Sequence, residues 1–217
     1  MVDVGTGMIR KKVWLMDKQI IISVGREFGS GGHEIAEGLA KHYNIPLFDK
    51  EIFDHIEENE SISAEVAQFY DEKPVSPIFY PVMMDGMNLP LEQTVANHIF
   101  NFIKAKGDKE KQSFVIVGRC AEYVLRDNPN MISIFVLGDR EIKCQRVMKK
   151  YGLDEKAAYN RMRREDKMRK TYHNFYADGK WGDSRSYDIC INSSKLGLDK
   201  TLEALITYID KAQEKES

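Results

Sequence analysis

The sequence predicts an α/β fold in which helices cover both faces of a five-stranded parallel sheet. Short apolar runs without polar alternation are typical of strands that are buried on both faces. Segments with helical periodicity separate these runs, and this alternation favours a parallel sheet. Several of the runs end at glycine or at a charged residue, which is typical of the ligand-binding edge of such a sheet. A length of 217 residues suits one domain.

The first predicted strand covers 19–24 and leads through a glycine-rich loop into a helix with apolar residues from Ile35 to Tyr43. Residues 45–48 predict a second strand, which ends at Asp49. Helices are expected at 50–58 and near 63–69. A long loop or arm is expected at 72–90, which contains four prolines and three methionines.

The second half of the chain continues the alternation of strands and helices. Strands are predicted at 114–117, 132–137 and 188–192, and helices at 91–106, 121–126, 140–151, 154–170 and 198–211. The helix at 154–170 is strongly basic, and an aromatic, glycine-containing loop is expected after it, from Tyr172 to Gly182. A basic helix followed by such a loop suits a lid that closes on phosphates, although a solvated surface helix has the same pattern.

Composition excludes several classes of protein. With 32 basic and 34 acidic residues, the net charge of −2 gives no attraction to nucleic acid or to a membrane surface. No apolar run approaches the length of a membrane span. Residues 1–18 lack the features of a signal peptide and are expected to form an N-terminal arm before a domain at 19–217. The scattered cysteines, without zinc spacing, indicate reduced thiols in a cytoplasmic protein, and they are Cys120, Cys144 and Cys190.

The stretch from Gly29 to His33 is the strongest local signal. Glycines between a strand and a helix allow successive backbone N–H groups to form an anion nest, and the dipole of the following helix favours a phosphate there. The alternative is a plain strand–helix turn. A dinucleotide fingerprint fits poorly because Glu34 replaces its third glycine, and Glu37 replaces the second histidine of a zinc-protease motif.

The loop departs from the standard phosphate-binding pattern G-x-x-x-x-G-K-S/T. Aligned on Gly31, the chain has Arg26 at the first glycine, Gly32 at the lysine and His33 at the hydroxyl residue. The backbone cradle is therefore predicted, while the two side chains that normally contact phosphate and magnesium are absent. A branched side chain at Gly31 is expected to block phosphate binding and to spare the fold.

Arg119 follows an apolar strand and Gly118, which places it at the ligand-binding edge of the sheet. A guanidinium fork binds phosphate through two hydrogen bonds, and the alternative is an ordinary surface ion pair.

Four separated blocks, residues 21–53, 115–127, 132–139 and 164–194, resemble the cytidylate-kinase-like P-loop family, and the similarity extends over about 19–210. The resemblance implies the fold of nucleoside monophosphate kinases, with a substrate-binding insert at 60–110 and a lid at 154–186. It implies transfer of a phosphoryl group from ATP, with Mg²⁺, to a small acceptor such as CMP. The resemblance does not decide which residues bind the metal or whether the protein forms a homo-oligomer.

The resemblance also assigns roles to residues by position. It places the ATP phosphates on Gly29, Ser30, Gly31, Gly32 and His33, the acceptor on Asp49, Lys50 and Arg119, the lid cations at Arg164, Lys167 and Arg169, and the donor base near Arg146, Asn192 and Ser193. For Arg146, a solvent-exposed position on the helix surface without a ligand is an equal alternative to contact with the donor base. Lys50 and Cys120 replace a serine and an aspartate of cytidylate kinases, which alters the expected acceptor contacts.

The missing lysine leads to a specific hypothesis. Lid cations are expected to replace it and, together with Arg119, to clamp the phosphates. The rival functions are a nucleotide-binding or sensing protein without catalysis, and a kinase for another small metabolite on the same fold.

Overall fold

The computed structural model describes residues 18–49 and 91–214. Its centre is a five-stranded parallel sheet of order β2-β3-β1-β4-β5. The strands are β1 (Ile21–Arg26), β2 (Leu47–Phe48), β3 (Phe114–Val117), β4 (Met131–Leu137) and β5 (Ile189–Asn192). In the middle of the sheet, Ile21 of β1 pairs with Phe114 on one side and with Met131 on the other. The predicted fold class is confirmed.

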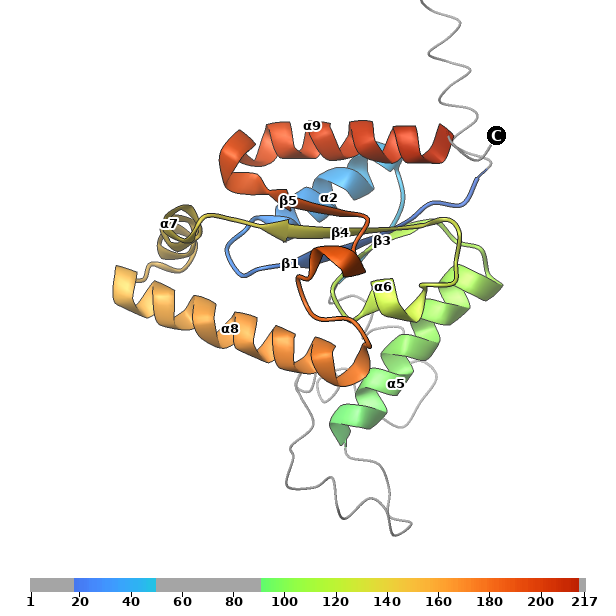
Figure 1. Ribbon diagram of the computed structural model, residues 1–217, viewed down its shortest axis with the longest axis horizontal. Coiled ribbons are helices and arrows are strands. Elements are labelled where there is room, and N and C mark those ends of the chain that lie inside the picture. Colours follow the sequence, from blue (N-terminus) through green and yellow to red (C-terminus); the bar gives the residue numbers. More distant parts are fainter. Residues whose placement is uncertain (1–17, 50–90, 215–217) are drawn as a thin grey trace, which may run out of the picture.

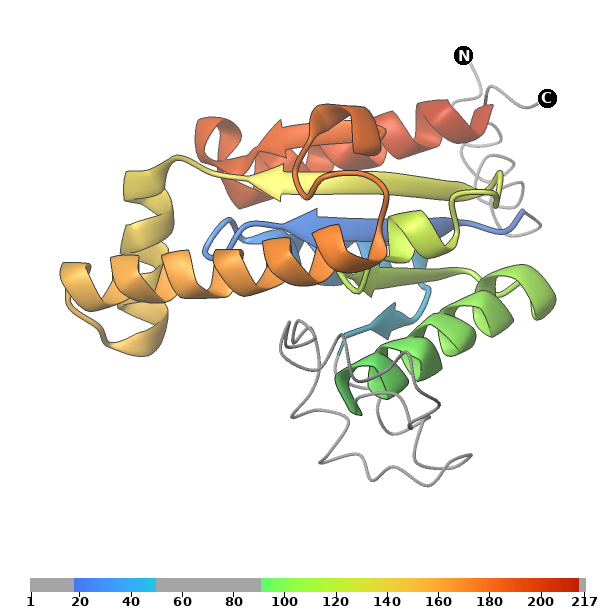
Figure 2. The ribbon, with the colours of Figure 1, turned by 60° about the horizontal axis from the view of Figure 1, so that its bottom comes forward.

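Helices cover both faces of the sheet (Figures 1 and 2). One face carries α2 (Gly32–Tyr43) and α9 (Ser193–Glu214), and the other carries α5 (Leu91–Lys104), α6 (Ala121–Val124) and much of α8 (Glu155–Tyr176). Helix α7 (Arg140–Tyr151) lies beyond the carboxyl ends of the strands. The covering explains why β1, β3 and β4 are mostly apolar, since nearly all of their residues are buried.

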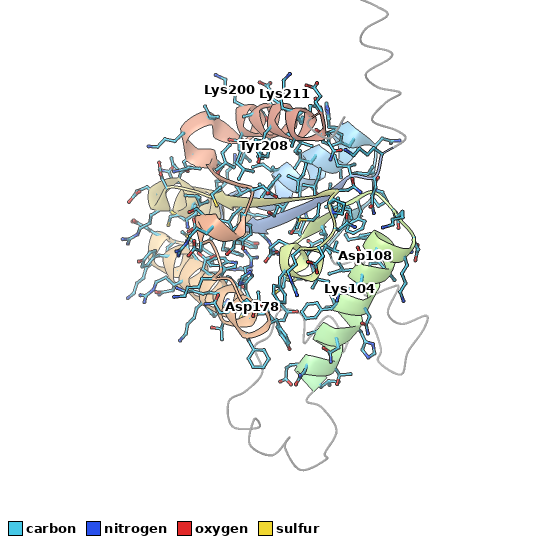
Figure 3. All side chains as sticks on the ribbon, turned by 45° about the vertical axis from the view of Figure 1, so that its right-hand side comes forward. Lys104, Asp108, Asp178, Lys200, Tyr208 and Lys211 are labelled. Atoms are coloured by element: carbon cyan, nitrogen blue, oxygen red, sulfur yellow. The ribbon has the colours of Figure 1, made fainter. Side chains whose placement is uncertain are left out.

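Successive side chains of each strand point to opposite faces of the sheet. On β1, Ile22 and Val24 join the cluster that contains Leu39 of α2 and Leu205 of α9. The intervening Ile21 packs with residues of α5 on the opposite side. The outward faces of the helices are charged, as Lys104, Lys200 and Lys211 show (Figure 3). Helices α2, α5 and α9 therefore each bury an apolar stripe against the sheet.

Two helices differ by several residues from their predicted bounds, and α5 and α6 each end two residues early. The residues from Tyr172 to Tyr176, predicted as a loop, continue α8 because Tyr172 packs in a buried cluster with Ala96 and Cys120. Helix α9 begins at Ser193 rather than at 198, and Gly197 interrupts it with a φ of 75°. Short turns complete the chain, a π-helical turn η2 (Ala105–Lys109) and a 3₁₀ turn η3 (Ser184–Ser186).

Several predictions lie outside the described residues. They are the arm before Lys18, the helices at 50–58 and 63–69, the segment 72–90, the part of the substrate-binding insert before Leu91, and Lys50. Among the helices of 18–49 and 91–214, none combines the length and the apolar character needed to cross a membrane.

Candidate functional site

A cavity of about 870 Å³ lies at the carboxyl edge of the sheet, where the sequence places the ligand site. The loop after β1, the start of α2, the ends of β2 and β3, and helices α7 and α8 all contribute to its wall. Most of the predicted site residues line it, namely Gly29, Gly31, Gly32, His33, Asp49, Arg119, Arg146 and Arg169. Parallel topology brings these residues together because each follows the end of a strand or lies on a helix beside it.

The glycine loop has the backbone expected of a phosphate cradle. Gly29 and Gly31 have φ values of 81° and 80°, a left-handed conformation that glycine adopts without strain. Gly31 is the N-cap of α2, so the first N–H groups of that helix lie beside the cavity. A helix N-terminus of this kind favours an anion. The loop residues therefore fit a phosphate chain.

Packing also requires glycine in this loop. A Cβ atom at Gly31 would overlap Cδ2 of Leu198 on α9, and a Cβ atom at Gly29 would lie 2.9 Å from the carbonyl oxygen of Lys143. A branched residue at Gly31 would therefore strain the backbone at a φ of 80° and push the Leu198 side chain aside, so it is expected to affect the fold as well as phosphate binding.

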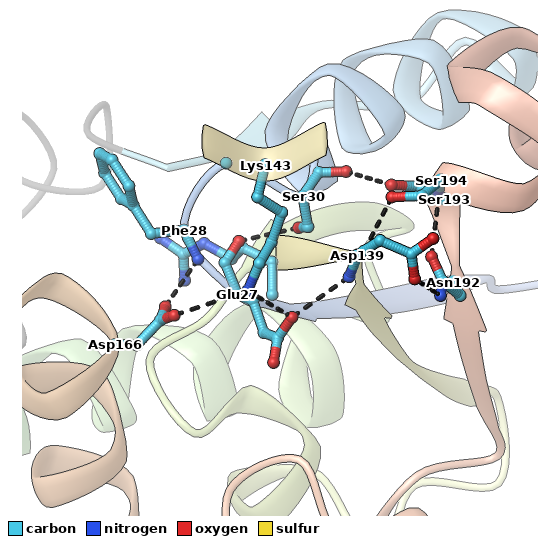
Figure 4. Close-up of polar contacts among 12 residues, drawn as sticks. Glu27, Phe28, Ser30, Asp139, Lys143, Asp166, Asn192, Ser193 and Ser194 are labelled. Atoms are coloured by element: carbon cyan, nitrogen blue, oxygen red, sulfur yellow. Dashed lines mark hydrogen bonds and ion pairs between the residues drawn. The ribbon is translucent and has the colours of Figure 1, made fainter. Parts of the chain in front are cut away.

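Ser30 has a structural position inside the loop. It is fully buried, its Oγ donates to the carbonyl of Glu27 at 2.8 Å, and its own carbonyl accepts from Ser193 Oγ at 2.5 Å (Figure 4). The Nη1 atom of Arg146 donates to the same carbonyl at 2.8 Å and to Ser193 Oγ at 3.0 Å. The N–H of Ser30 also donates to the carbonyl of Glu27, at 3.2 Å, so both the side chain and the backbone of Ser30 fix the shape of the loop.

These bonds involve residues that the sequence places near the donor base. Ser193 is fully buried, and its hydroxyl holds the loop. Asn192 donates through Nδ2 to Asp139 at 2.8 Å and does not line the cavity. Arg146 lines the cavity, but its Nη1 atom is committed to the loop. Arg146 and Ser193 thus support the shape of the loop, whereas Asn192 joins the end of β5 to the N-cap of α7.

Asp49 and Arg119 form an ion pair at the wall of the cavity. Nη1 of Arg119 donates to Asp49 Oδ1 at 2.9 Å and to the carbonyl of Val117 at 2.7 Å, and Arg119 is only 2% exposed. The backbone around it is unusual, because Gly118, Arg119 and Cys120 have φ values of 75°, 56° and 54°. Left-handed non-glycine residues are strained, and such strain is concentrated at functional sites. The turn aims a buried arginine at the cavity.

His33 connects this ion pair to the glycine loop. Its Nδ1 lies 3.2 Å from Asp49 Oδ2 and its Nε2 lies 3.2 Å from Glu37 Oε1. The hydrogen bond to Asp49 raises the pKa of His33 above its ordinary value of 6.5, against the opposing effect of burial. Burial alone would raise the pKa of Asp49, but the His33 hydrogen bond and the charges of Arg119 and Arg26 outweigh it and hold that pKa well below its usual value. Asp49 is therefore ionised at neutral pH.

His33→Asn should give a pH-dependent loss of stability. A histidine whose pKa is raised by folding stabilises the protein fully below pH 6.5, and this contribution disappears as the pH rises through the folded pKa. Because the side chain of His33 is 39% exposed, we expect a loss of less than about 1 kcal/mol. Urea denaturation of both proteins between about pH 5.5 and pH 8.5 measures it. A difference that is equal at all pH values would contradict the assignment.

The three predicted lid cations separate in the structure. Arg169 lines the cavity, donates through Nη1 to the carbonyl of Arg26 at 3.4 Å, and lies over the ring of Phe28. Arg164 and Lys167 instead line a separate groove between α7 and α8. Residues two and five positions from Arg169 point to other sides of a helix with 3.6 residues per turn. In this arrangement of the helices Arg164 and Lys167 do not line the cavity, and their contact with the phosphates stays a prediction.

A buried charge cluster behind the loop was missed by the sequence analysis. Lys143, which is 7% exposed, places its Nζ atom 2.8 Å from Glu27 Oε2 and 3.9 Å from Asp166 Oδ2 (Figure 4). Glu27 also accepts from Gly138 N–H at 3.2 Å, and Asp166 accepts from Phe28 N–H at 2.6 Å. The cluster ties α7 and α8 to the loop. Its members are far apart in the chain, so no local pattern indicates them.

The described residues contain no group of three or more His, Cys, Asp or Glu side chains that could hold a metal ion. Mg²⁺ in phosphoryl-transfer sites is commonly held by one or two carboxylates together with the substrate phosphates. The carboxylate of Asp49, at the cavity wall and ionised, fits that requirement.

Comparisons with known proteins agree with this arrangement. Residues 21–195 match the model of the cytidylate kinase-like family. A cytidylate kinase of Methanopyrus kandleri is 24% identical over 207 residues, which cover 91% of this chain and 96% of that protein. The crystal structure of an uncharacterized protein from Eubacterium ventriosum is 50% identical, with a TM-score of 0.70 over 88% of this chain and 99% of that one.

A more distant match shows the fold alone. Shikimate kinase from Bacteroides thetaiotaomicron is 11% identical, with a TM-score of 0.52 over 88% of this chain and 98% of that one.

Proposed function

The chain belongs to the cytidylate kinase-like family, and on that premise we propose that it transfers the γ-phosphoryl group of ATP to a small acceptor, with CMP as the first candidate. The observation that carries the proposal is that the glycine cradle and the Asp49–Arg119 pair line one cavity. A kinase needs a donor site and an acceptor site in one cavity, whereas a simple nucleotide-binding protein needs only the cradle. The volume of about 870 Å³ is within the range of small-molecule sites.

On the donor side, the backbone from Gly29 to His33 binds the phosphate chain of ATP. Mg²⁺, when bound with ATP, neutralises charge on the donor phosphates, and Asp49 is the carboxylate at hand to hold it or its water. Arg169 adds a positive charge from α8 at the wall of the same cavity. Phosphoryl transfer needs little covalent help from the protein, so positioning and charge neutralisation account for the chemistry.

On the acceptor side, the guanidinium of Arg119 binds the phosphate of a nucleoside monophosphate. The buried ion pair with Asp49 fixes the position of this group before the acceptor arrives, and such fixed orientation contributes to the rate. Cys120 is 2% exposed and packs against Tyr172, so its side chain does not line the cavity. Recognition of the base therefore depends on other residues, and the acceptor must be found by screening.

The experiment is an ADP-release assay with ATP, Mg²⁺ and a panel of CMP, dCMP, UMP and AMP, with the nucleoside cytidine as the matched control without a phosphate. We expect one monophosphate to stimulate ADP release and cytidine to have no effect. A thermal-shift screen of the same compounds and of small alcohols identifies the acceptor independently. If ATP binds but no acceptor stimulates ADP release, the protein is a nucleotide-binding protein without this activity.

A further inference from the structure

Positions 26 and 32 contact each other across the glycine loop. A Cβ atom on Gly32 would lie 2.5 Å from Cβ and 3.2 Å from Cγ of Arg26. Real Cβ atoms do not approach other carbons so closely, because close-packed atoms repel at that distance. The stem of Arg26 therefore occupies the space that a side chain at position 32 would need.

The backbone of Gly32 does not itself require glycine. Gly32 is the first residue of α2 and does not share the positive φ of Gly29 and Gly31. Any residue could adopt its conformation if the space were empty. The glycine at 32 is thus explained by the arginine at 26 and not by the turn.

Arg26 lies at the same cavity as the glycine cradle. It lines the wall with Gly29, Gly31 and Gly32, and its charge helps to lower the pKa of Asp49, so the guanidinium acts inside the site. Its backbone is fixed at the end of β1, where the next residue, Glu27, donates its N–H to the carbonyl of Val136 at 3.0 Å. The arginine therefore extends from a rigid strand end, unlike a cation on a lid.

In the standard loop the first position is glycine and the seventh is the lysine that reaches the β- and γ-phosphates. Here the first position carries the cation and the seventh is glycine. We propose that Arg26 supplies the charge that this lysine would supply, so that the arginine at the first position compensates for the missing lysine at the seventh. The inference rests on the donor site of the proposed function. A guanidinium stays charged at all relevant pH values and can donate two parallel hydrogen bonds to phosphate, where an ammonium acts as a point charge.

The test measures binding of ATP and of inorganic tripolyphosphate by calorimetry. Arg26→Ala should weaken both at least about tenfold, since a charge-assisted hydrogen bond is lost. Arg26→Gly should do the same, and the double variant Arg26→Gly, Gly32→Lys should recover most of the affinity because it restores the first glycine and the lysine of the standard loop. Gly32→Lys alone should lower the midpoint of thermal unfolding, because the stem of Arg26 still occupies the space that the new side chain needs. Arg185→Ala, which makes the same charge change at a side chain 86% exposed and outside the cavity, is the control and should bind like the wild type.

Wild-type affinity of Arg26→Ala for tripolyphosphate would overturn the proposal, and so would a folded double variant that binds no better than Arg26→Gly. If the double variant does not fold, Arg26→Ala and Arg26→Lys test the proposal. The lysine variant should then bind with an affinity between those of Arg26→Ala and the wild type. Both probes bind without an acceptor, so the result is independent of phosphoryl transfer. A wild type that binds them but phosphorylates no acceptor would contradict the proposed function alone.

Discussion

Arg119→Ala should abolish phosphoryl transfer and destabilise the fold by about 3 kcal/mol, because it removes the buried guanidinium that pairs with the half-buried carboxylate of Asp49. The carbonyl of Val117 also loses its donor. Arg119→Lys retains the charge and much of the stability. It loses the planar fork, and we expect kcat/KM to fall about 30-fold, which corresponds to about 2 kcal/mol of transition-state binding.

Steady-state kinetics with the acceptor found by screening, together with urea denaturation, measure the two effects separately. Arg126→Lys is the matched control, since Arg126 is exposed on the same segment of chain and donates to the carbonyl of Tyr123. It should change neither quantity. Equal kcat/KM for Arg119→Lys and the wild type would show that Arg119 does not contact the acceptor phosphate.

Lys143→Met should destabilise the fold by about 3 kcal/mol at neutral pH, because it removes the cation shared by Glu27 and Asp166. Burial already raises the pKa of Asp166 above its ordinary value, against the hydrogen bond from Phe28 N–H and the charge of Lys143. A carboxyl group whose folded pKa is raised costs stability when it is ionised. The loss should therefore decrease as the pH falls through the pKa of Asp166 and the group takes up a proton.

Denaturation of the variant and the wild type at neutral and acidic pH tests this expectation. Lys150→Met provides the control on the same helix, because its pair with Glu34 is exposed on both sides and should contribute less than about 1 kcal/mol. Equal losses for the two lysine variants would show that the cluster behind the loop has no special role in stability.

Local patterns in the sequence were sufficient for the framework. The run 114–117 is β3 with the predicted bounds, and the helix at 140–151 is α7 with the predicted bounds. The glycine loop, Asp49 and Arg119 were found because each directly follows an apolar run, and the parallel topology places such positions at one edge. These features depend on neighbours within a few residues, so the sequence by itself determined them.

The tertiary structure decided which side chains face the cavity. The orientation of α8 about its own axis places Arg169 at the cavity and turns Arg164 and Lys167 away from it. A small error in a predicted orientation would select different residues of the helix. Arg146 and Ser193 hold the loop through a carbonyl more than a hundred residues earlier in the chain.

The contact between Arg26 and Gly32, only six positions apart, depends on the path of the loop between them. Each of these relations joins atoms that meet only when the chain has folded, because contact between distant residues is set by packing and not by periodicity. The sequence therefore determined the sheet, the cradle and the edge that carries the site, while close packing decided which cations belong to it.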